Sequence, residues 1–263
     1  MGLGERQVGW SFDGREALDR LGPPTVVLVV LLGAWEGYVT LSRTPPVILP
    51  GPVDVGGALV VHWSVLLEAA GITAVTAFGG LVGGLVVGFP IAYATSRSRS
   101  VASFVLPYVV ALRIAPLVAI APLLVLWLGE GVFARVVLVT TMTVFPVVIA
   151  SYDGLRTVPR GYVDLANSVA VPDRRIFIRV ELPAAAPSVL AGVKLAAALS
   201  VVGAVVAEFV TLESGLGFQL FEASRSLETP LMFAALVTLA ALGVVFYGTP
   251  VLFARYSRWA RVS

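Results

Sequence analysis

The sequence has 263 residues, of which 58% are hydrophobic and only 13% charged, and its mean hydropathy is +0.93. About a quarter of the residues in soluble domains are charged, so this composition excludes a water-soluble domain and predicts a chain embedded in lipid. The net charge is only +2 and the basic residues form no dense stripe, which argues against a nucleic-acid partner. The sequence has no cysteine and one histidine, His62, so we expect no metal site built from thiolates or histidines.

Six apolar runs follow one another along the chain, each long enough to cross a bilayer as a helix. They cover residues 23–41, 72–94, 101–128, 132–150, 187–210 and 231–253. Lipid cannot hydrogen-bond free backbone groups, and the runs lack the period-two alternation of a barrel. The sequence therefore predicts an all-α polytopic membrane protein with about six transmembrane helices: a cytoplasmic tail over residues 1–22 and a transmembrane domain over residues 23–263.

The arginines indicate the orientation, because cytoplasmic segments retain positive charge. With the N-terminus inside, thirteen of the 18 basic residues lie on the cytoplasmic side: Arg6, Arg15, Arg20, Arg97, Arg99, Arg156, Arg160, Arg174, Arg175, Arg179, Arg255, Arg258 and Arg261. The outer side then holds Arg43, Arg135 and Arg225. We predict a multi-pass protein of the cell membrane with both termini in the cytoplasm.

Small residues and prolines mark the second and third spans. The second span contains five glycines close to one helical face, Gly79, Gly80, Gly83, Gly84 and Gly88, which predicts a close helix crossing. The third span contains Pro107, Pro116 and Pro122, which predict bends or local openings of the helix.

The charged residues considered for the pathway or the membrane interior are Arg113, Lys194 and Glu208. An uncompensated charge in the bilayer costs about 2.5 to 3.5 kcal/mol, so such side chains turn toward protein or water. We expect Arg113 to face the bundle or a pathway, Lys194 to reach toward the cytoplasmic surface and Glu208 to lie near the outer surface. A contact with cargo and a polar contact that only holds two spans together both remain open.

The segment 151–186 is the one long cytoplasmic loop. Between Arg160 and Ala170, four apolar residues fall on one helical face, Tyr162, Leu165, Ala166 and Val169, with Asp164 nearly opposite. Pro172 breaks this helix, residues 173–180 predict a second short helix, and Pro183 and Pro187 are expected to close the loop before the fifth span. By pattern alone, helices lying on the lipid surface and helices docking a partner are both open.

The spacing of this loop resembles the "EAA" loop of binding-protein-dependent ABC importer permeases. That family has Glu-Ala-Ala, three residues, Gly, nine residues, Ile, any residue and Leu-Pro. The corresponding residues here are Asp164, Leu165, Ala166, Ala170, Val180, Leu182 and Pro183. Ala166, Leu182 and Pro183 match in identity, and the other four are substitutions at conserved spacing. The resemblance implies a type I ABC importer permease fold and a loop, about 151–186, that couples the membrane domain to an ATPase.

Further motifs resemble the nitrate, sulfonate and taurine branch, which also includes permeases for thiamine precursors. They are Leu49-Pro50-Gly51-Pro52, Leu112-Arg113 with Pro116 and Pro122 leading to Leu126-Trp127-Leu128-Gly129, and Ala207-Glu208 followed by Gly215-Leu216-Gly217. The resemblance implies a cytoplasmic ABC ATPase, an external substrate-binding protein and a second permease copy, expected to be a homodimer, as partners in the lipid bilayer. The implied cargo is a small solute of the nitrate, sulfonate, taurine or vitamin-precursor type.

Other activities fit the sequence less well. The only lysine, Lys194, is followed by Leu195, so the chain has no P-loop, and we expect no cofactor in this chain and ATP in a separate subunit. The lone histidine and the lack of a His-Glu-x-x-His motif argue against an intramembrane hydrolase, so we expect no enzyme. A proton-coupled secondary transporter that uses Glu36 or Glu208 is the alternative, although it leaves the long loop without a role.

Overall fold

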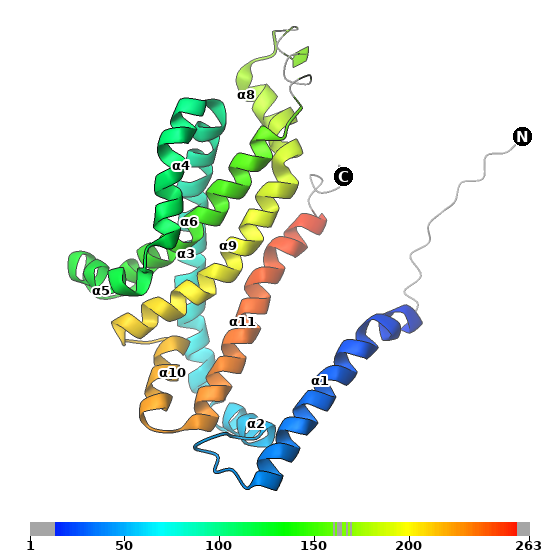
Figure 1. The fold of residues 1–263 in the computed structure, drawn as a ribbon, viewed down its shortest axis with the longest axis vertical. Helices are drawn as coiled ribbons and strands as arrows, with labels where there is room; N and C mark the ends of the chain where they lie inside the picture. The colour runs from blue at the N-terminus through cyan, green and yellow to red at the C-terminus, as the bar shows by residue number, and fades with distance from the viewer. Residues whose placement is uncertain (1–13, 160, 162–164, 167, 169, 257–263) are drawn as a thin grey trace, which may run out of the picture.

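The computed structural model describes residues 14–159, 161, 165, 166, 168 and 170–256, and its elements are helical (Figure 1). The helices are α1 (Gly14–Ser42), α2 (Pro52–Val61), α3 (Trp63–Arg97), α4 (Arg99–Ile114), α5 (Leu117–Leu128), α6 (Val132–Arg156), α8 (Asp173–Ile176), the π-helix η1 (Phe177–Glu181), α9 (Leu182–Thr211), α10 (Leu216–Arg225) and α11 (Thr229–Tyr256). Within the described residues, five helices are long and apolar enough to cross a membrane, or six if the bent pair α4 and α5 forms one span. The predicted all-α fold with about six spans is confirmed.

The core is formed by α3, α6 and α9, and the contacts of α6 with α3 and with α9 are the most extensive between the described helices. The predicted close crossing of the glycine-rich span is confirmed. A Cβ atom added at Gly80 would lie 2.1 Å from a methyl carbon of Val139, and one added at Gly84 would lie 2.3 Å from the hydroxyl of Thr143. The Thr143 hydroxyl also donates a hydrogen bond to the carbonyl of Gly80 at 2.8 Å. The missing side chains of α3 thus let the backbone of α6 approach closely.

The third span is broken more sharply than proline positions alone suggest. The axes of α4 and α5 differ by 98°, and the break falls at Ala115 and Pro116. Pro107 and Pro122 lie within helices, so only one of the three prolines interrupts the span. Figure 1 shows α5 leaving the bundle almost at a right angle to α4. The expected continuous run over residues 101–128 is therefore two helices.

The prediction that Pro183 and Pro187 close the loop before the fifth span is wrong. The helical stretch from Asp173 to Thr211 is continuous, and both prolines lie within α9. Pro183 is the second residue of α9 and has no N–H to continue the bonding from the preceding turn. The π-helical turn η1 immediately precedes it, and there the N–H of Leu182 bonds to the carbonyl of Phe177, five residues back. A π-helical turn of this kind is a local irregularity of a helix, and here it lies just before a proline that cannot donate a backbone hydrogen bond.

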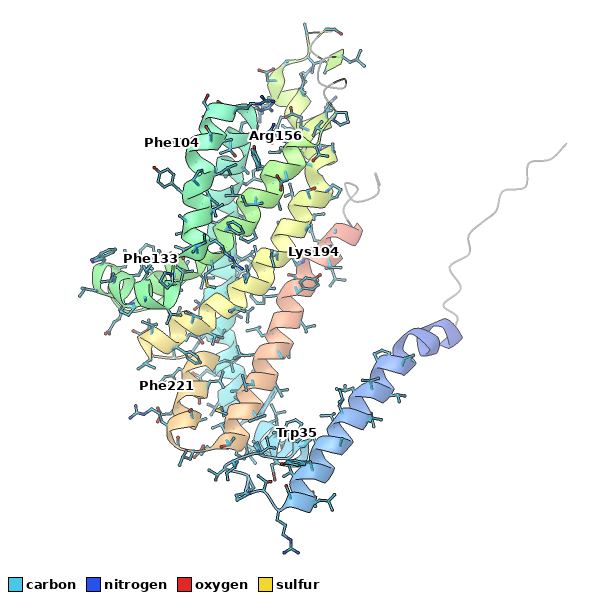
Figure 2. The ribbon with its side chains drawn as sticks, in the orientation of Figure 1. Trp35, Phe104, Phe133, Arg156, Lys194 and Phe221 are labelled. Atoms are coloured by element: carbon cyan, nitrogen blue, oxygen red, sulfur yellow. The ribbon has the colours of Figure 1, made fainter. Side chains whose placement is uncertain are left out.

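Two shorter helices that the apolar runs did not reveal, α2 and α10, lie at the end of the molecule opposite α8 (Figure 1). They pack with parts of α3 and α11 in one apolar cluster that includes Val55, Leu66 and Leu216. The helix α1 begins at Gly14, inside the segment expected to be a tail, and joins this end through Trp35, whose ring lies 5.8 Å from that of Phe233 (Figure 2). Only 6% of the apolar window of α1 is buried in this chain.

Candidate coupling loop and intramembrane polar sites

The predicted coupling loop lies at the end of the molecule marked by α8 (Figure 1). Its residue Asp164 lies outside the described residues, as do Tyr162 and Val169. Leu165 and Ala166 are helical, and the Leu165 side chain is 66% exposed. This apolar side chain is therefore largely open among the described residues, and its place on a docking face stays a prediction.

Ala170 ends the first helix of the loop in a left-handed conformation with φ of +54°. The N–H of Val171 bonds back to the carbonyl of Ala166 at 3.1 Å, which closes the helix end. This geometry suits glycine, because a Cβ atom destabilises the left-handed region. It gives a physical reason for the glycine in the family pattern, which this chain replaces with alanine.

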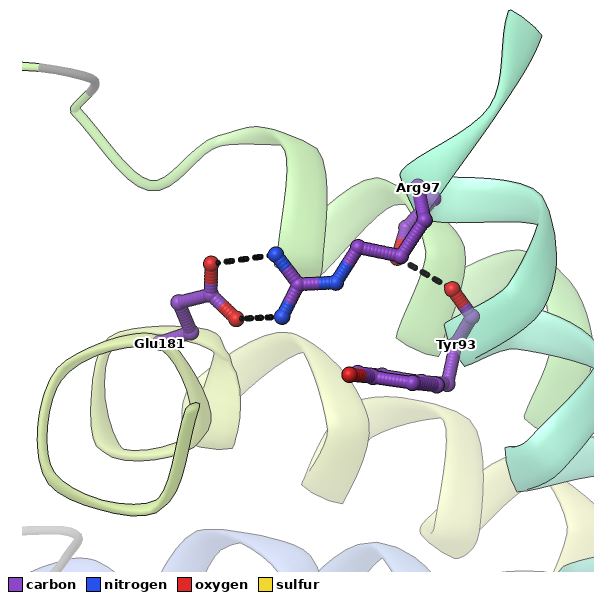
Figure 3. Close-up of polar contacts among 4 residues, drawn as sticks. Tyr93, Arg97 and Glu181 are labelled. Atoms are coloured by element: carbon purple, nitrogen blue, oxygen red, sulfur yellow. Dashed lines mark hydrogen bonds and ion pairs between the residues drawn. The ribbon is translucent and has the colours of Figure 1, made fainter. Parts of the chain in front are cut away.

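The second half of the loop leads into the membrane domain without interruption. Val180 is in η1, and Leu182 and Pro183 begin α9, all three partly buried. Between them, Glu181 is buried and accepts two hydrogen bonds from Arg97 at the C-terminal end of α3, at 2.9 and 2.5 Å (Figure 3). The loop is thus bound to α3 as well as continuous with α9.

Sequence reasoning missed this pair. Arg97 was counted only as a cytoplasmic charge, and Glu181 occupies the position that the family pattern leaves free. One signal was present: Glu181 is the only acid between Asp173 and Glu208, in a stretch of apolar and basic residues. Such an isolated acid beside a buried face requires a partner.

A second polar cluster joins α3, α9 and α10 at the opposite end. Glu208 is fully buried, and its Oε2 accepts a hydrogen bond from the N–H of Gly217 at 2.7 Å and lies 3.1 Å from the hydroxyl of Thr73. The same hydroxyl accepts a hydrogen bond from the N–H of Leu216 at 2.9 Å. Gly215 has φ of +105°, and a Cβ atom there would lie 2.2 Å from the Glu208 carboxyl carbon. The two halves of the Ala207-Glu208 and Gly215-Leu216-Gly217 motif therefore bind each other.

Arg135 supports the same end from the first turn of α6. Its side chain is buried, its Nη1 donates to the carbonyl and hydroxyl of Ser214 at 3.2 and 3.3 Å, and its Nη2 lies 3.7 Å from Glu213. The residue predicted to lie at the outer surface is therefore packed under the segment that connects α9 and α10.

Arg113 lies one residue before the end of α4, beside the break. Its side chain is exposed in the single chain, its guanidinium lies 5.7 Å from the centre of the Phe145 ring, and it lines a cavity of about 210 Å³. Thr141 and Met142 of α6 and Val206 of α9 line the same cavity. Lys194 is half-buried partway along α9 (Figure 2) and does not line this cavity. The structure thus brings neither Lys194 nor Glu208 to Arg113.

Glu36, the other carboxylate considered for proton transfer, lies beside the start of α2. Its Oε2 accepts a hydrogen bond from the N–H of Val53 at 3.2 Å, and a Cβ atom at Gly51 would lie 2.6 Å from the same oxygen. A carboxylate at a helix N-terminus is stabilised by the free amides and the helix dipole. Both Glu36 and Glu208 therefore have local structural partners.

The fold and these sites define a polytopic helical membrane protein in which one long connection, between α6 and α9, lies at one end of the bundle. Residues 80–257 match the family described as binding-protein-dependent transport system inner membrane component, and the chain belongs to this family. It is therefore an ABC transporter permease subunit of the importer type and not an enzyme.

Curated relatives cover most of the chain. A probable ABC transporter permease protein of Haemophilus influenzae is 36% identical over 228 residues, 87% of this chain and 93% of the relative. The riboflavin transport system permease protein of Chloroflexus aurantiacus is 34% identical over 86% of this chain and 85% of its own length. The formylaminopyrimidine transport permease protein of Halalkalibacterium halodurans is 28% identical over 84% and 89%.

A solved structure has the same fold. In the inward-facing MetNI methionine ABC transporter, one chain superposes with a TM-score of 0.64 at 18% identity, covering 73% of this chain and 96% of that one. The predicted type I importer permease fold is confirmed.

Proposed function

We propose that this permease imports a small solute, delivered by an external binding protein, and that the loop of residues 151–186 docks a cytoplasmic ATPase that drives the import. The observation that carries the proposal is the coupling loop: an exposed apolar side chain, Leu165, precedes a helical connection that is fixed to both α3 and α9. A surface-lipid role would not require the second attachment to α3.

The solute is proposed to be of the nitrate, sulfonate, taurine or vitamin-precursor type. The names of the riboflavin and formylaminopyrimidine relatives support the last of these classes. Arg113 is proposed to contact the solute in the pathway, because it is a cation beside a cavity at a broken span. Loss of uptake in Arg113→Ala, with intact assembly, would support this role, whereas unchanged uptake would reject it.

The permease is proposed to work as a homodimer with both termini in the cytoplasm. The exposed apolar faces of α1 and α11, with 6% and 11% of their apolar windows buried in this chain, support a second copy or lipid as their cover. Glu36 and Glu208 have local partners, which favours an ATP-driven mechanism over proton transfer through these residues.

Co-purification tests the docking proposal. Ala166→Trp adds a large side chain to the docking helix and is expected to overpack the contact by about 1 to 3 kcal/mol. The variant should insert normally but lose the co-purifying ATPase and ATP-driven uptake. Val86→Trp, on the exposed face of α3, is the control and should retain both. Normal ATPase association and uptake in Ala166→Trp would reject the docking role of the loop.

A further inference from the structure

The inner end of α3 carries three side chains that all contact η1. Phe89, Tyr93 and Arg97 are spaced four residues apart, so they lie on one side of the helix. Phe177 packs edge-on against Tyr93 with ring centres 4.8 Å apart and lies 6.5 Å from Phe89, while Arg97 binds Glu181. Phe177 and Glu181 are the first and last residues of η1. One face of α3 therefore holds both ends of the π-helical turn.

The ion pair also fixes an orientation. The two guanidinium nitrogens of Arg97 donate to the two different carboxylate oxygens of Glu181, and the guanidinium lies 4.9 Å from the centre of the Tyr93 ring (Figure 3). The Glu181 side chain is only 9% exposed, compared with 42% for Arg97. A two-point hydrogen bond to a buried carboxylate resists rotation and is costly to break on one side, unlike a surface ion pair.

The π-helical turn is where the connection from α8 to α9 departs from regular α-helical bonding. The N–H of Leu182 reaches back five residues, and Pro183 follows without an N–H of its own. Turns of this kind are local irregularities at which helices bend. A movement of the coupling loop would be absorbed at η1 unless both ends of the turn were held.

We propose that Arg97 and Glu181 are positioning residues that transmit movement of the coupling loop to α3. The inference rests on the proposed function, because an ATPase has to move the loop. With the pair intact, η1 and the inner end of α3 move as one unit. Since α3 is a single helix of 35 residues, the displacement also reaches its outer end. Without the pair, η1 bends and the movement reaches α9 alone.

The natural absence of cysteine allows a direct test. Glu68→Cys places a single thiol on an exposed position near the outer end of α3, where it can carry an environment-sensitive fluorophore. The labelled permease, purified with its ATPase into lipid nanodiscs, is mixed with ATP, and fluorescence and phosphate release are recorded together. The test variants are Arg97→Gln, Arg97→Lys and Glu181→Gln. The matched control is Arg99→Gln, which removes an exposed arginine at the start of α4.

The expected result is a separation of the two readouts. Arg97→Gln and Glu181→Gln should keep ATPase association and phosphate release but show a fluorescence response roughly 2- to 30-fold smaller, as for residues that carry coupling between distant sites. The control should respond like the unsubstituted chain. Arg97→Lys retains the positive charge but not the two-point hydrogen bond, so it should also give a reduced response. If the glutamine variants do not assemble with the ATPase, Arg97→Lys alone tests whether the pair transmits the movement.

The negative outcomes are distinguishable. If no ATPase accompanies the unsubstituted chain, the proposed function fails. If the ATPase is bound and active but the label at position 68 never responds, or responds in Arg97→Gln and Arg97→Lys as strongly as in the unsubstituted chain, only the transmission role of the pair is overturned.

Discussion

At the scale of single residues, Ala170 is held in a conformation that its side chain disfavours. The left-handed region costs an L-residue about 1 to 2 kcal/mol relative to glycine. Ala170 adopts this conformation at the turn between the two halves of the coupling loop, where the N–H of Val171 bonds to the last turn of the preceding helix.

Ala170→Gly is therefore expected to stabilise the turn, by roughly 1 kcal/mol after the extra backbone entropy of glycine is subtracted. Hydrogen exchange of the Val171 amide should slow down. Ala170→Val, with a β-branched side chain at positive φ, should accelerate the exchange. Faster exchange in the glycine variant would contradict the strain argument.

Substitutions of Glu208 test how much the buried hydrogen bond to the N–H of Gly217 contributes to stability. Glu208→Gln keeps an oxygen that can accept from Gly217, so stability should remain close to that of the unsubstituted chain. Glu208→Ala leaves the buried Gly217 N–H without its acceptor, which costs about 1 to 3 kcal/mol. Thermal unfolding in detergent measures the difference.

The same two variants address proton coupling. Uptake that survives in Glu208→Gln would exclude a protonation cycle at this carboxyl group. Loss of uptake in Glu208→Gln with unchanged thermal stability would instead favour the secondary-transporter alternative.

At the scale of elements, the crossing of α3 and α6 depends on the absence of side chains. Gly80→Ala would place a methyl group inside the contact distance of Val139, so we expect a loss of about 1 to 3 kcal/mol in stability. Gly71→Ala on the same helix meets no atom within 4 Å and is the matched control.

A substitution of Val139, the residue that the added methyl group would touch, should compensate for part of the loss in Gly80→Ala. Val139→Ala removes the methyl groups closest to the new side chain, so the double variant is expected to recover part of the thermal stability lost in Gly80→Ala. Equal unfolding temperatures for Gly80→Ala and Gly71→Ala would show that the crossing is looser than described.

Sequence patterns predicted those elements whose signal is local. Continuous apolar runs located the spans, and glycine spacing located the close crossing. The prolines predicted an opening of the helix at Pro116, but they did not reveal that the span breaks there alone, because Pro90, Pro107 and Pro122 lie inside helices. The short helices α2 and α10 lack the length that identifies a span.

The isolated acid Glu181 stands out in the sequence, but no local pattern identifies the distant residue to which Glu181 or Glu208 bonds. Arg97 and Glu181 are 84 positions apart, and Thr73 and Glu208 are 135 apart. Their pairing follows from the packing of α3 beside α9, which no single segment specifies.

At the scale of the whole molecule, the two polar clusters lie at opposite ends of the α3 and α9 contact. Arg97 with Glu181 binds the C-terminal end of α3 to η1, which continues into α9, and Thr73 with Glu208 binds the N-terminal part of α3 to the C-terminal end of α9. Between them the contact is apolar, so the two helices are fixed to each other at both ends of their contact.

The proposed orientation can be tested with one thiol at a time. A cysteine at exposed Arg174, in α8, should react with a membrane-impermeant reagent only after permeabilisation. A cysteine at exposed Glu222, in α10, should react in intact cells. The reverse pattern would place the coupling loop outside and overturn the topology.

The break between α4 and α5 also has a consequence for the surrounding lipid. The 16 residues of α4 rise about 24 Å, which is less than the roughly 30 Å thickness of the hydrocarbon layer. Since α5 turns away by 98°, the helix does not complete the crossing in its original direction. We therefore expect a negative hydrophobic mismatch at this position, relieved by thinning of the adjacent leaflet or by water beside Arg113. Reconstituted uptake is accordingly expected to be faster in bilayers with shorter acyl chains than in thick ones.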